Sequence, residues 1–233
     1  MKLIGLIGGM SWESSAQYYR IINREVQAQL GGVHSARSVL VSVDFAEIER
    51  LQHEGAWDEL ADLMIDAARR VERAGADFIV LCTNTMHRVA DEIAGAVKIP
   101  LLHIADPTAR QMAEAGIKRV GLLGTAFTME QDFYKGRLRR NFGFDVLIPE
   151  AADRAAVHEI IYNELVAGNV RPESRTAYRA VMSRLVERGA EAVILGCTEI
   201  MLLVSQEDCS VPLFDTTTLH AKAAVNMALA GAA

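Results

Sequence analysis

The sequence contains little cysteine, no long apolar run and no excess of positive charge. Its three cysteines have no Cys-x-x-Cys spacing and no histidine at ligand spacing, so we expect neither a disulfide framework nor a zinc site. No apolar run reaches the roughly 18 residues that a membrane-spanning helix needs. These absences lead us to expect a chain that uses no metal and does not cross a membrane.

Basic residues are outnumbered, with 24 lysines and arginines against 30 aspartates and glutamates and a net charge of −6. A protein that binds nucleic acid neutralises phosphates with a stripe of Lys and Arg, and the sequence has none. The densest basic cluster, KGRLRR at 135–140, is predicted to be the solvated face of a helix. We therefore expect no nucleic-acid partner.

The N-terminal stretch MKLIGLIGGMSWES shares one feature with a signal peptide, because Lys2 precedes a short apolar run. The run stops at Gly8-Gly9 after about five residues, whereas the apolar part of a signal peptide has about 7 to 15. A first β-strand explains the stretch better, and a cytoplasmic location becomes the default expectation.

What is present is a globular composition, with 51% apolar and 23% charged residues in 233, enough for one large domain or two small ones. Short strand-like runs alternate with amphipathic helical patterns. The strand-like runs include KLIGLIGG, SVLVSVDF, ADFIVL and IPLLHI, and the helical patterns include SWESSAQYYRIINREVQAQLG and WDELADLMIDAARRVERAG. This alternation predicts an α/β fold in which parallel sheets are covered by helices on both faces.

The second half of the chain repeats the plan of the first. Three pairs of segments match in the same order, at offsets of 112 to 116 positions. They are KLIGLIGG with KRVGLLGT, VERAGADFIVL with VERGAEAVIL, and KIPLLHIAD with SVPLFDTTT. The repeat predicts two similar α/β lobes related by a pseudo-twofold axis, residues 1–103 with 213–233 and residues 104–212. Since ligands bind beyond the carboxyl ends of parallel strands, we expect the substrate between the two lobes.

Counting from the glycine that opens each matching strand shows which residues correspond at the strand ends. Thr83 lies eight positions after Gly75, and Cys197 lies eight positions after Gly189. Thr83 therefore corresponds to Cys197, and Cys82 is one position out of step. The two strand ends offer one thiol and one hydroxyl.

A strand end that leads into a helix N-terminus favours anions, so we expect the pKa of Cys197 to fall from about 8.5 toward neutrality. The alternative for Cys197 is a small buried apolar residue. Cys82 is one step earlier on its strand, so its side chain should point to the other face and lie in the core. Cys209 is expected to be structural.

Three motifs, GLIGGMSWESS, CTNTMH and GCTEI, resemble those of the cofactor-independent aspartate/glutamate racemase family, and the similarity extends over essentially the whole chain. The resemblance implies amino-acid racemisation without pyridoxal phosphate or metal. It implies that two residues flank the substrate α-carbon, one removing the α-proton as a thiolate and one returning a proton. In better-known members both are cysteines; here the positions are Thr83 and Cys197. Many relatives are dimers, which makes a homodimer the expected assembly.

Threonine at position 83 has a chemical consequence, because its hydroxyl is too weak an acid to rest as an alkoxide. Thr83 is thus a poor general base but can still donate a proton, directly or through water. We expect asymmetric catalysis, with Cys197 the efficient base for one enantiomer and the reverse direction slower. The rival hypothesis is that Cys82 acts as a second thiol.

The resemblance also assigns substrate contacts. The α-carboxylate and ammonium would be held by Asn84, Thr85, Thr198 and the backbone amides near Met10 and Ser11. Asn84 and Thr85 have an alternative role as helix caps.

Further positions carry two interpretations each. Thr125 ends the strand that matches LIGG and is expected at the mouth of the cleft, and Thr128 with Gln131 is predicted to form a capping box. Glu199 is expected either to orient the substrate ammonium or to have a surface or helix-capping role. His87, in the NTxH pattern, is expected either to tune the Thr83 site or to cap and pack.

The choice of substrate depends on how the enzyme binds the side-chain carboxylate of aspartate or glutamate. Aspartate-preferring members are expected to carry a basic residue near position 52 and another near 166, but this sequence has Gln52 and the uncharged stretch LVAGNV. Without such a clamp, recognition of a distal carboxylate weakens. We expect either aspartate or glutamate, or a broader set of small polar amino acids such as homoserine.

Other functions fit parts of the pattern. Maleate isomerases, hydantoin racemases and arylmalonate decarboxylases share the duplicated fold and a strand-end cysteine. A non-catalytic small-molecule or nucleotide-binding protein is the alternative from a different class, but GLIGGMS lacks both the GxGxxG pattern and a P-loop lysine.

Overall fold

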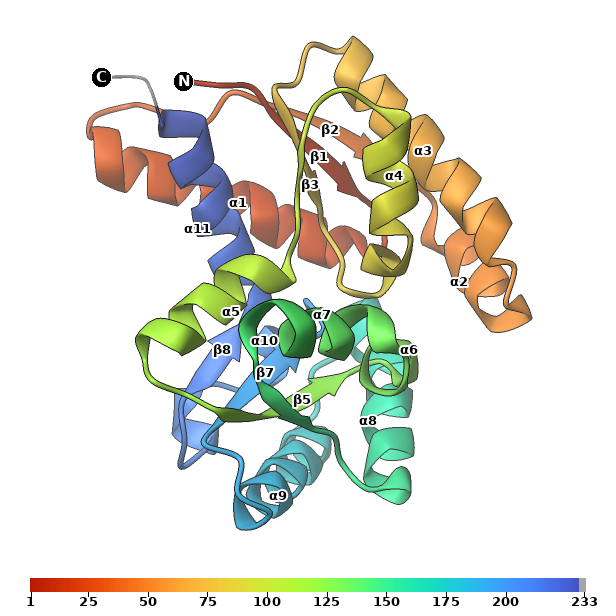
Figure 1. Ribbon diagram of the computed structural model, residues 1–233, viewed down its shortest axis with the longest axis vertical. Coiled ribbons are helices and arrows are strands. Elements are labelled where there is room, and N and C mark those ends of the chain that lie inside the picture. Colours follow the sequence, from red (N-terminus) through yellow and green to blue (C-terminus); the bar gives the residue numbers. More distant parts are fainter. Residues whose placement is uncertain (231–233) are drawn as a thin grey trace. The chain divides into compact units, whose positions relative to one another are not determined.

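The computed structural model describes residues 1–230 and divides the chain into two units. The first unit comprises Met1–Ile104 and the segment that begins at Thr217, and the second comprises Ala105–Thr216. Each unit contains a four-stranded parallel sheet with helices on both sides (Figure 1). Within residues 1–230, no helix combines the length and apolar character needed to cross a membrane.

The first unit has the strand order β2-β1-β3-β4. Its strands are β1 (Ile4–Gly8), β2 (Ser38–Ser42), β3 (Phe78–Leu81) and β4 (Leu101–Leu102). Its helices are α1 (Trp12–Leu30), α2 (Phe45–Glu54), α3 (Trp57–Arg73), the 3₁₀ helix η1 (Thr85–Val89), α4 (Ala90–Ala96) and α11 (Thr216–Leu229).

The second unit has the equivalent order, β6-β5-β7-β8. Its strands are β5 (Arg119–Gly124), β6 (Asp145–Leu147), β7 (Ala192–Gly196) and β8 (Leu213–Asp215). Its helices are α5 (Ala105–Glu114), α6 (Ala126–Glu130), α7 (Asp132–Phe142), α8 (Ala151–Asn163), η2 (Leu165–Ala167), α9 (Pro172–Glu187), α10 (Ile200–Leu203) and η3 (Gln206–Asp208).

The strand register confirms the internal repeat. Gly5 pairs with Ile79 in the first sheet, and Gly121 pairs with Val193 in the second. An equivalent hydrogen bond joins β3 to the residue before β4 and β7 to the residue before β8. The Ile79 amide donates to the Pro100 carbonyl at 2.9 Å, and the Val193 amide donates to the Pro212 carbonyl at 3.0 Å. Positions 83 and 197 therefore occupy equivalent places, directly beyond the central strands of their units.

The repeated glycines let a helix approach each sheet closely. A Cβ atom on Gly5 would lie 2.1 Å from Val71 Cγ1 of α3, and a Cβ atom on Gly121 would lie 3.0 Å from Leu185 Cδ1 of α9. A side chain at Gly5 would push α3 off the sheet, and one at Gly121 would require Leu185 of α9 to move by a few tenths of an ångström. The pattern that predicted the repeat thus marks the helix–sheet contact of each unit.

Alternate residues of β1 and β3 enter two different apolar layers. Ile7, Ile79 and Leu81 pack with α2, α3 and α4, whereas Leu6 and Val80 pack with α1 and α11. Cys82 belongs to the second layer and is fully buried there, which confirms its predicted place in the core. Burial in this apolar layer raises the pKa of the Cys82 thiol far above its ordinary value.

Two local features differ from the sequence predictions. The strand expected over residues 38–45 ends at Ser42, because the Asp44 side chain accepts a hydrogen bond from the Ala46 amide at 3.1 Å and caps α2, a helix that was not predicted. The division between the units falls at 104/105 and 216/217, against expected boundaries at 103/104 and 212/213. The last four residues differ because β8 pairs with β7.

Candidate active site

The first group of site residues lies at the carboxyl ends of β1 and β3, which are neighbours in the first sheet. Thr83, Asn84 and Thr85 come after β3, separated from it by Cys82, and are buried. The Thr83 amide donates to the Leu81 carbonyl at 2.9 Å, and the Thr83 carbonyl accepts a hydrogen bond from His87 Nδ1 at 2.7 Å. Both backbone polar groups of Thr83 are therefore held. Asn84 occupies the cap position of η1 but its side chain makes no capping bond, so the alternative role in capping is wrong for Asn84.

The turn after β1 brings Met10 and Ser11 to the same edge. Gly9 adopts φ +92°, and a Cβ atom there would lie 2.1 Å from the Val43 carbonyl oxygen, so only glycine fits this turn. The Gly9 amide donates to Ser15 Oγ at 2.9 Å, which ties the turn to α1.

Ser11 is the N-cap residue of α1, yet its buried hydroxyl makes no hydrogen bond within the part of the chain that the structure describes. A buried hydroxyl without a partner is costly unless a ligand satisfies it. The N-terminus of a 19-residue helix also favours a bound anion. Both features suit a carboxylate at Ser11.

Gln52 approaches this group from α2. Its side chain is buried, and its Nε2 lies 3.3 Å from the Met86 sulfur in η1. The residue therefore lies beside the loop that follows β3 and presents an amide in place of a charge. Val166, near the second position at which a base is expected, lies in the 3₁₀ helix Leu165–Ala167 of the other unit.

The second group lies at the ends of β5 and β7, which are also neighbours, since Gly124 pairs with Gly196. Thr125 follows β5 and caps α6 by accepting a hydrogen bond from the Thr128 amide at 3.3 Å. The capping box predicted for Thr128 and Gln131 is wrong, because the helix begins one turn earlier. Thr128 lies inside α6, and Gln131 follows its last residue.

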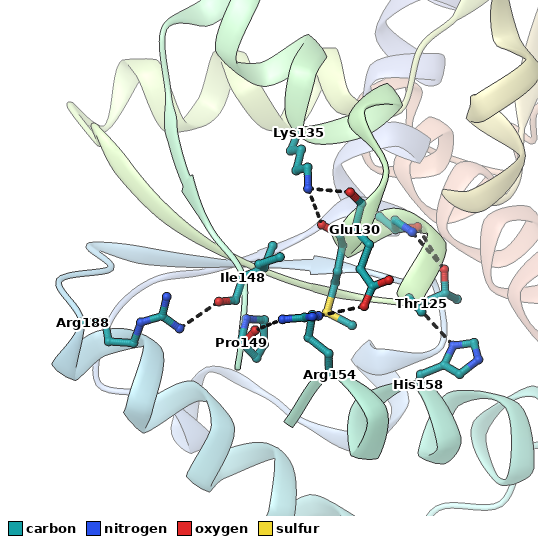
Figure 2. Close-up of polar contacts among 11 residues, drawn as sticks. Thr125, Glu130, Lys135, Ile148, Pro149, Arg154, His158 and Arg188 are labelled. Atoms are coloured by element: carbon teal, nitrogen blue, oxygen red, sulfur yellow. Dashed lines mark hydrogen bonds and ion pairs between the residues drawn. The ribbon is translucent and has the colours of Figure 1, made fainter. Parts of the chain in front are cut away.

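Side chains from α7 and α8 hold α6, which begins directly after Thr125 (Figure 2). His158 Nδ1 accepts a hydrogen bond from the Ala126 amide at 3.2 Å, and Arg154 Nε donates to Glu130 Oε1 at 2.9 Å. Lys135 Nζ donates to the Glu130 carbonyl at 2.7 Å, so this partly exposed member of the basic cluster also supports the fold. These contacts hold α6, and with it Thr125, the residue that caps the helix.

Cys197 is directly bonded to its neighbours in the GCTE sequence. Its thiol donates to Glu199 Oε2 at 2.9 Å, and the Thr198 hydroxyl donates to the same oxygen at 3.0 Å. Thr198 and Glu199 are buried, and Cys197 is half-buried against the apolar layer of α8 and α9. The resting arrangement is a protonated thiol beside a carboxylate.

The predicted fall in the pKa of Cys197 is wrong. Burial and the negative charge of Glu199 raise the pKa of the thiol well above its ordinary value, and they outweigh the lowering by the Thr198 and Glu199 amides. The expected helix effect is small because α10 has only four residues. Cys197 therefore needs its proton removed before it can act as a base.

We expect Glu199→Gln to make Cys197 more reactive toward iodoacetamide. Removing the carboxylate charge lowers the thiol pKa, and one pKa unit, about 1.4 kcal/mol, raises the thiolate fraction at neutral pH roughly tenfold. The initial alkylation rate at Cys197, followed by peptide mass spectrometry, measures this. In both forms the rate should rise with pH, since the thiolate accumulates as pH approaches the thiol pKa.

The matched control is Glu207→Gln, which removes an exposed carboxylate of the same unit. An unchanged alkylation rate in Glu199→Gln would contradict the assignment of the raised thiol pKa to the Glu199 charge.

The first unit also contains a group of three buried histidines, two of which follow the strands β3 and β4 of its sheet. His87 and His103 are in edge contact at 4.5 Å between ring centroids, and His220 lies 6.0 Å from His87. His220 accepts a hydrogen bond from the Tyr18 hydroxyl at 2.8 Å and donates to the Leu102 carbonyl at 2.8 Å. The sequence motif pointed to His87, but His103 and His220 were missed. Position 103 was recognisable as the first residue after β4.

The structure thus brings the predicted residues together as two groups, one in each unit. Met10, Ser11, Gln52, Thr83, Asn84 and Thr85 form the first, and Thr125, Cys197, Thr198 and Glu199 form the second. Their roles remain predictions. This is the site composition of a duplicated α/β protein equipped for proton transfer, with a hydroxyl and a thiol at equivalent strand ends and no cluster of metal-binding side chains among the described residues.

Comparison with known families agrees with this class. The model of the Asp/Glu/Hydantoin racemase family matches residues 7–224, nearly the whole chain. The chain therefore belongs to the Asp/Glu/hydantoin racemase family and is an isomerase.

Individual relatives match over most of their length. A candidate Asp/Glu racemase from Yersinia pestis is 56% identical, with a TM-score of 0.91, over 98% of this chain and 100% of its own. An aspartate racemase homologue from Pyrococcus horikoshii is 33% identical, with a TM-score of 0.82, over 98% and 99%. The broad-specificity amino-acid racemase RacX of Bacillus subtilis is 30% identical over 176 residues, 74% of each chain.

Proposed function

We propose that the chain is an amino-acid racemase that works without a cofactor and uses Cys197 and Thr83 on opposite sides of the substrate α-carbon. The observation that carries this proposal is the shared strand register, which gives a thiol and a hydroxyl equivalent places in two repeated units. Membership of a racemase family supports the same chemistry.

The proposed cycle begins at the bond between Cys197 and Glu199. Glu199 accepts the thiol proton and releases it to solvent, and the resulting thiolate removes the α-proton, so that the Cα–H bond breaks and an S–H bond forms. Thr83 donates its hydroxyl proton to the other side of the carbanion, directly or through water, and recovers a proton from solvent. In the reverse direction the thiol is already the proton donor, and Thr83 must act as the base.

The residues of the first group suit the substrate α-carboxylate. We propose that the Ser11 hydroxyl and the amide N–H groups at the start of α1 bind this anion, with Asn84 and Thr85 beside them. Thr198 would contribute from the other group. Holding the carboxylate also stabilises the negative charge that spreads onto it when the α-proton leaves.

The substrate range follows from Gln52. A buried amide beside Met86 donates hydrogen bonds to a carboxylate, an amide or a hydroxyl without the charge preference of arginine or lysine. Similarity to the broad-specificity racemase of B. subtilis supports the same interpretation. We propose that the enzyme accepts small polar amino acids, such as homoserine, as well as aspartate or glutamate.

A panel of L- and D-amino acids, incubated without pyridoxal phosphate and analysed by chiral chromatography, tests the proposed function. The expected result is formation of the opposite enantiomer from several polar amino acids, with Gln52→Arg shifting preference toward aspartate and glutamate by about tenfold or more through a new charge-assisted contact. No enantiomer conversion with any amino acid would contradict the proposal, and conversion with an unchanged preference in Gln52→Arg would contradict the role of Gln52.

We also propose a homodimer in the cytoplasm. The location is supported by the three free thiols, Cys82, Cys197 and Cys209, which persist in reducing compartments. The assembly is supported by the family resemblance.

A further inference from the structure

The side chain of His87 links Thr83 to Ile104, the last residue of the first unit before the chain enters the second. His87 Nδ1 lies 2.7 Å from the Thr83 carbonyl oxygen, and His87 Nε2 lies 3.1 Å from the Ile104 amide nitrogen. The ring is buried, and the His87 amide also donates to the Asn84 carbonyl at 3.1 Å. The His87 side chain thus contacts Thr83, which follows β3, and Ile104, which follows β4.

These two contacts fix the protonation of the ring. The Ile104 amide is a donor, so Nε2 must accept and carry no hydrogen. Nδ1 therefore carries the hydrogen and donates it to the Thr83 carbonyl. A neutral imidazole with this tautomer is required, and each nitrogen has a separate task.

We propose that His87 is a positioning residue for the proton donor Thr83, an inference that rests on the proposed function of that residue. The Thr83 amide is already bonded to Leu81, so the bond from His87 restrains the other side of the same residue. With both backbone groups held, the Cα–Cβ bond of Thr83 has a fixed direction, so the hydroxyl can move only by rotation about that bond. A displacement of about 1 Å at such a group costs on the order of a hundredfold in rate.

Two substitutions separate the tasks of the two nitrogens. In His87→Asn, the side-chain amide nitrogen takes the place of Nδ1 and can still donate to Thr83, but the acceptor for Ile104 is lost. In His87→Gln, the amide oxygen reaches the place of Nε2 and can still accept from Ile104, but the donor to Thr83 is lost. His220→Gln is the control, because His220 bonds Tyr18 and Leu102 and makes no bond to Thr83 among the contacts that the structure describes.

The readout is a ratio measured in heavy water with the enantiomer whose α-hydrogen faces Cys197. Deuterium entering the recovered substrate reports proton removal and return by Cys197, and formation of the opposite enantiomer reports donation from the Thr83 side. The ratio does not depend on the fraction of folded enzyme, so a loss of stability does not alter it.

We expect His87→Gln to lower inversion relative to exchange by about tenfold or more, and His87→Asn and His220→Gln to keep the wild-type ratio. An unchanged ratio in His87→Gln, or an equal change in His87→Asn and His87→Gln, would overturn the inference. Thr83→Val, measured alongside, distinguishes its failure from that of the proposed function. If Thr83→Val loses inversion and His87→Gln does not, only the role of His87 falls; if Thr83→Val keeps inversion, the proposed function falls.

Discussion

Cys197→Ser is expected to lower the rate of racemisation by about 10²–10⁴-fold, the usual contribution of a general base. A serine hydroxyl beside the Glu199 carboxylate does not ionise at neutral pH, so neither removal nor return of the α-proton is assisted on this side. Racemisation and deuterium exchange should fall together, because both begin with the thiolate. Chiral chromatography and mass spectrometry of the recovered amino acid measure the two rates.

Cys209→Ser is the matched control for this substitution. Cys209 is a half-buried thiol of the same unit that follows η3 and packs against the same apolar layer as Cys197. It has the same atomic change at a place away from the end of β7, and we expect wild-type rates. Activity that survives in Cys197→Ser, or disappears equally in Cys209→Ser, would contradict the assignment.

Thr83→Val is expected to lower inversion by about 10²–10⁴-fold while leaving deuterium exchange at one enantiomer. Valine has the shape of threonine without the hydroxyl, so the buried strand end keeps its packing while the proton donor is lost. Cys197 remains able to remove the α-proton that faces it and to return a deuteron to the same side. Thr83→Ser retains a hydroxyl and should keep most of the inversion.

The rival role of Cys82 as a second thiol predicts a different outcome. Cys82 is fully buried in the layer formed by α1 and α11, and burial disfavours its thiolate. We therefore expect Cys82→Ala to retain inversion. A loss in Cys82→Ala as large as that in Cys197→Ala, with Thr83→Val remaining active, would assign the second proton to Cys82.

Asymmetric catalysis takes a particular form in a racemase. The two enantiomers have equal free energy in water, so kcat/KM must be equal in the two directions, and the slower reverse direction predicted from the sequence cannot appear in that quantity. The asymmetry must appear in how the carbanion partitions. It returns readily to the Cys197 side, where the barrier is lower, and crosses less often to the Thr83 side.

The duplicated fold was predictable because each unit repeats a short set of residues with fixed mechanical roles. Gly5 and Gly121 allow a helix to pack closely against the sheet. The carbonyls of Pro100 and Pro212 accept equivalent hydrogen bonds from β3 and β7. Side-chain alternation placed Cys82 in the core for the same reason. Such features depend on local backbone geometry, which a sequence pattern records directly.

Features that depend on contacts between distant residues were not predictable. The pKa of Cys197 depends on the orientation of the Glu199 carboxylate and on burial, and counting along the strand reports neither. The contact between His87 and Ile104 joins residues 17 positions apart. The helix α2 was missed because the apolar alternation of β2 continues into Val43 and Phe45, and only the cap at Asp44 marks the change.

The most direct test of the two-sided mechanism is deuterium incorporation by the wild-type enzyme, starting separately from each pure enantiomer in heavy water. From one enantiomer, the recovered substrate should be deuterated well before its mirror image accumulates. From the other, the recovered substrate should stay protiated while its product is fully deuterated. The same balance of exchange and inversion from both enantiomers would contradict a thiol on one side and a hydroxyl on the other.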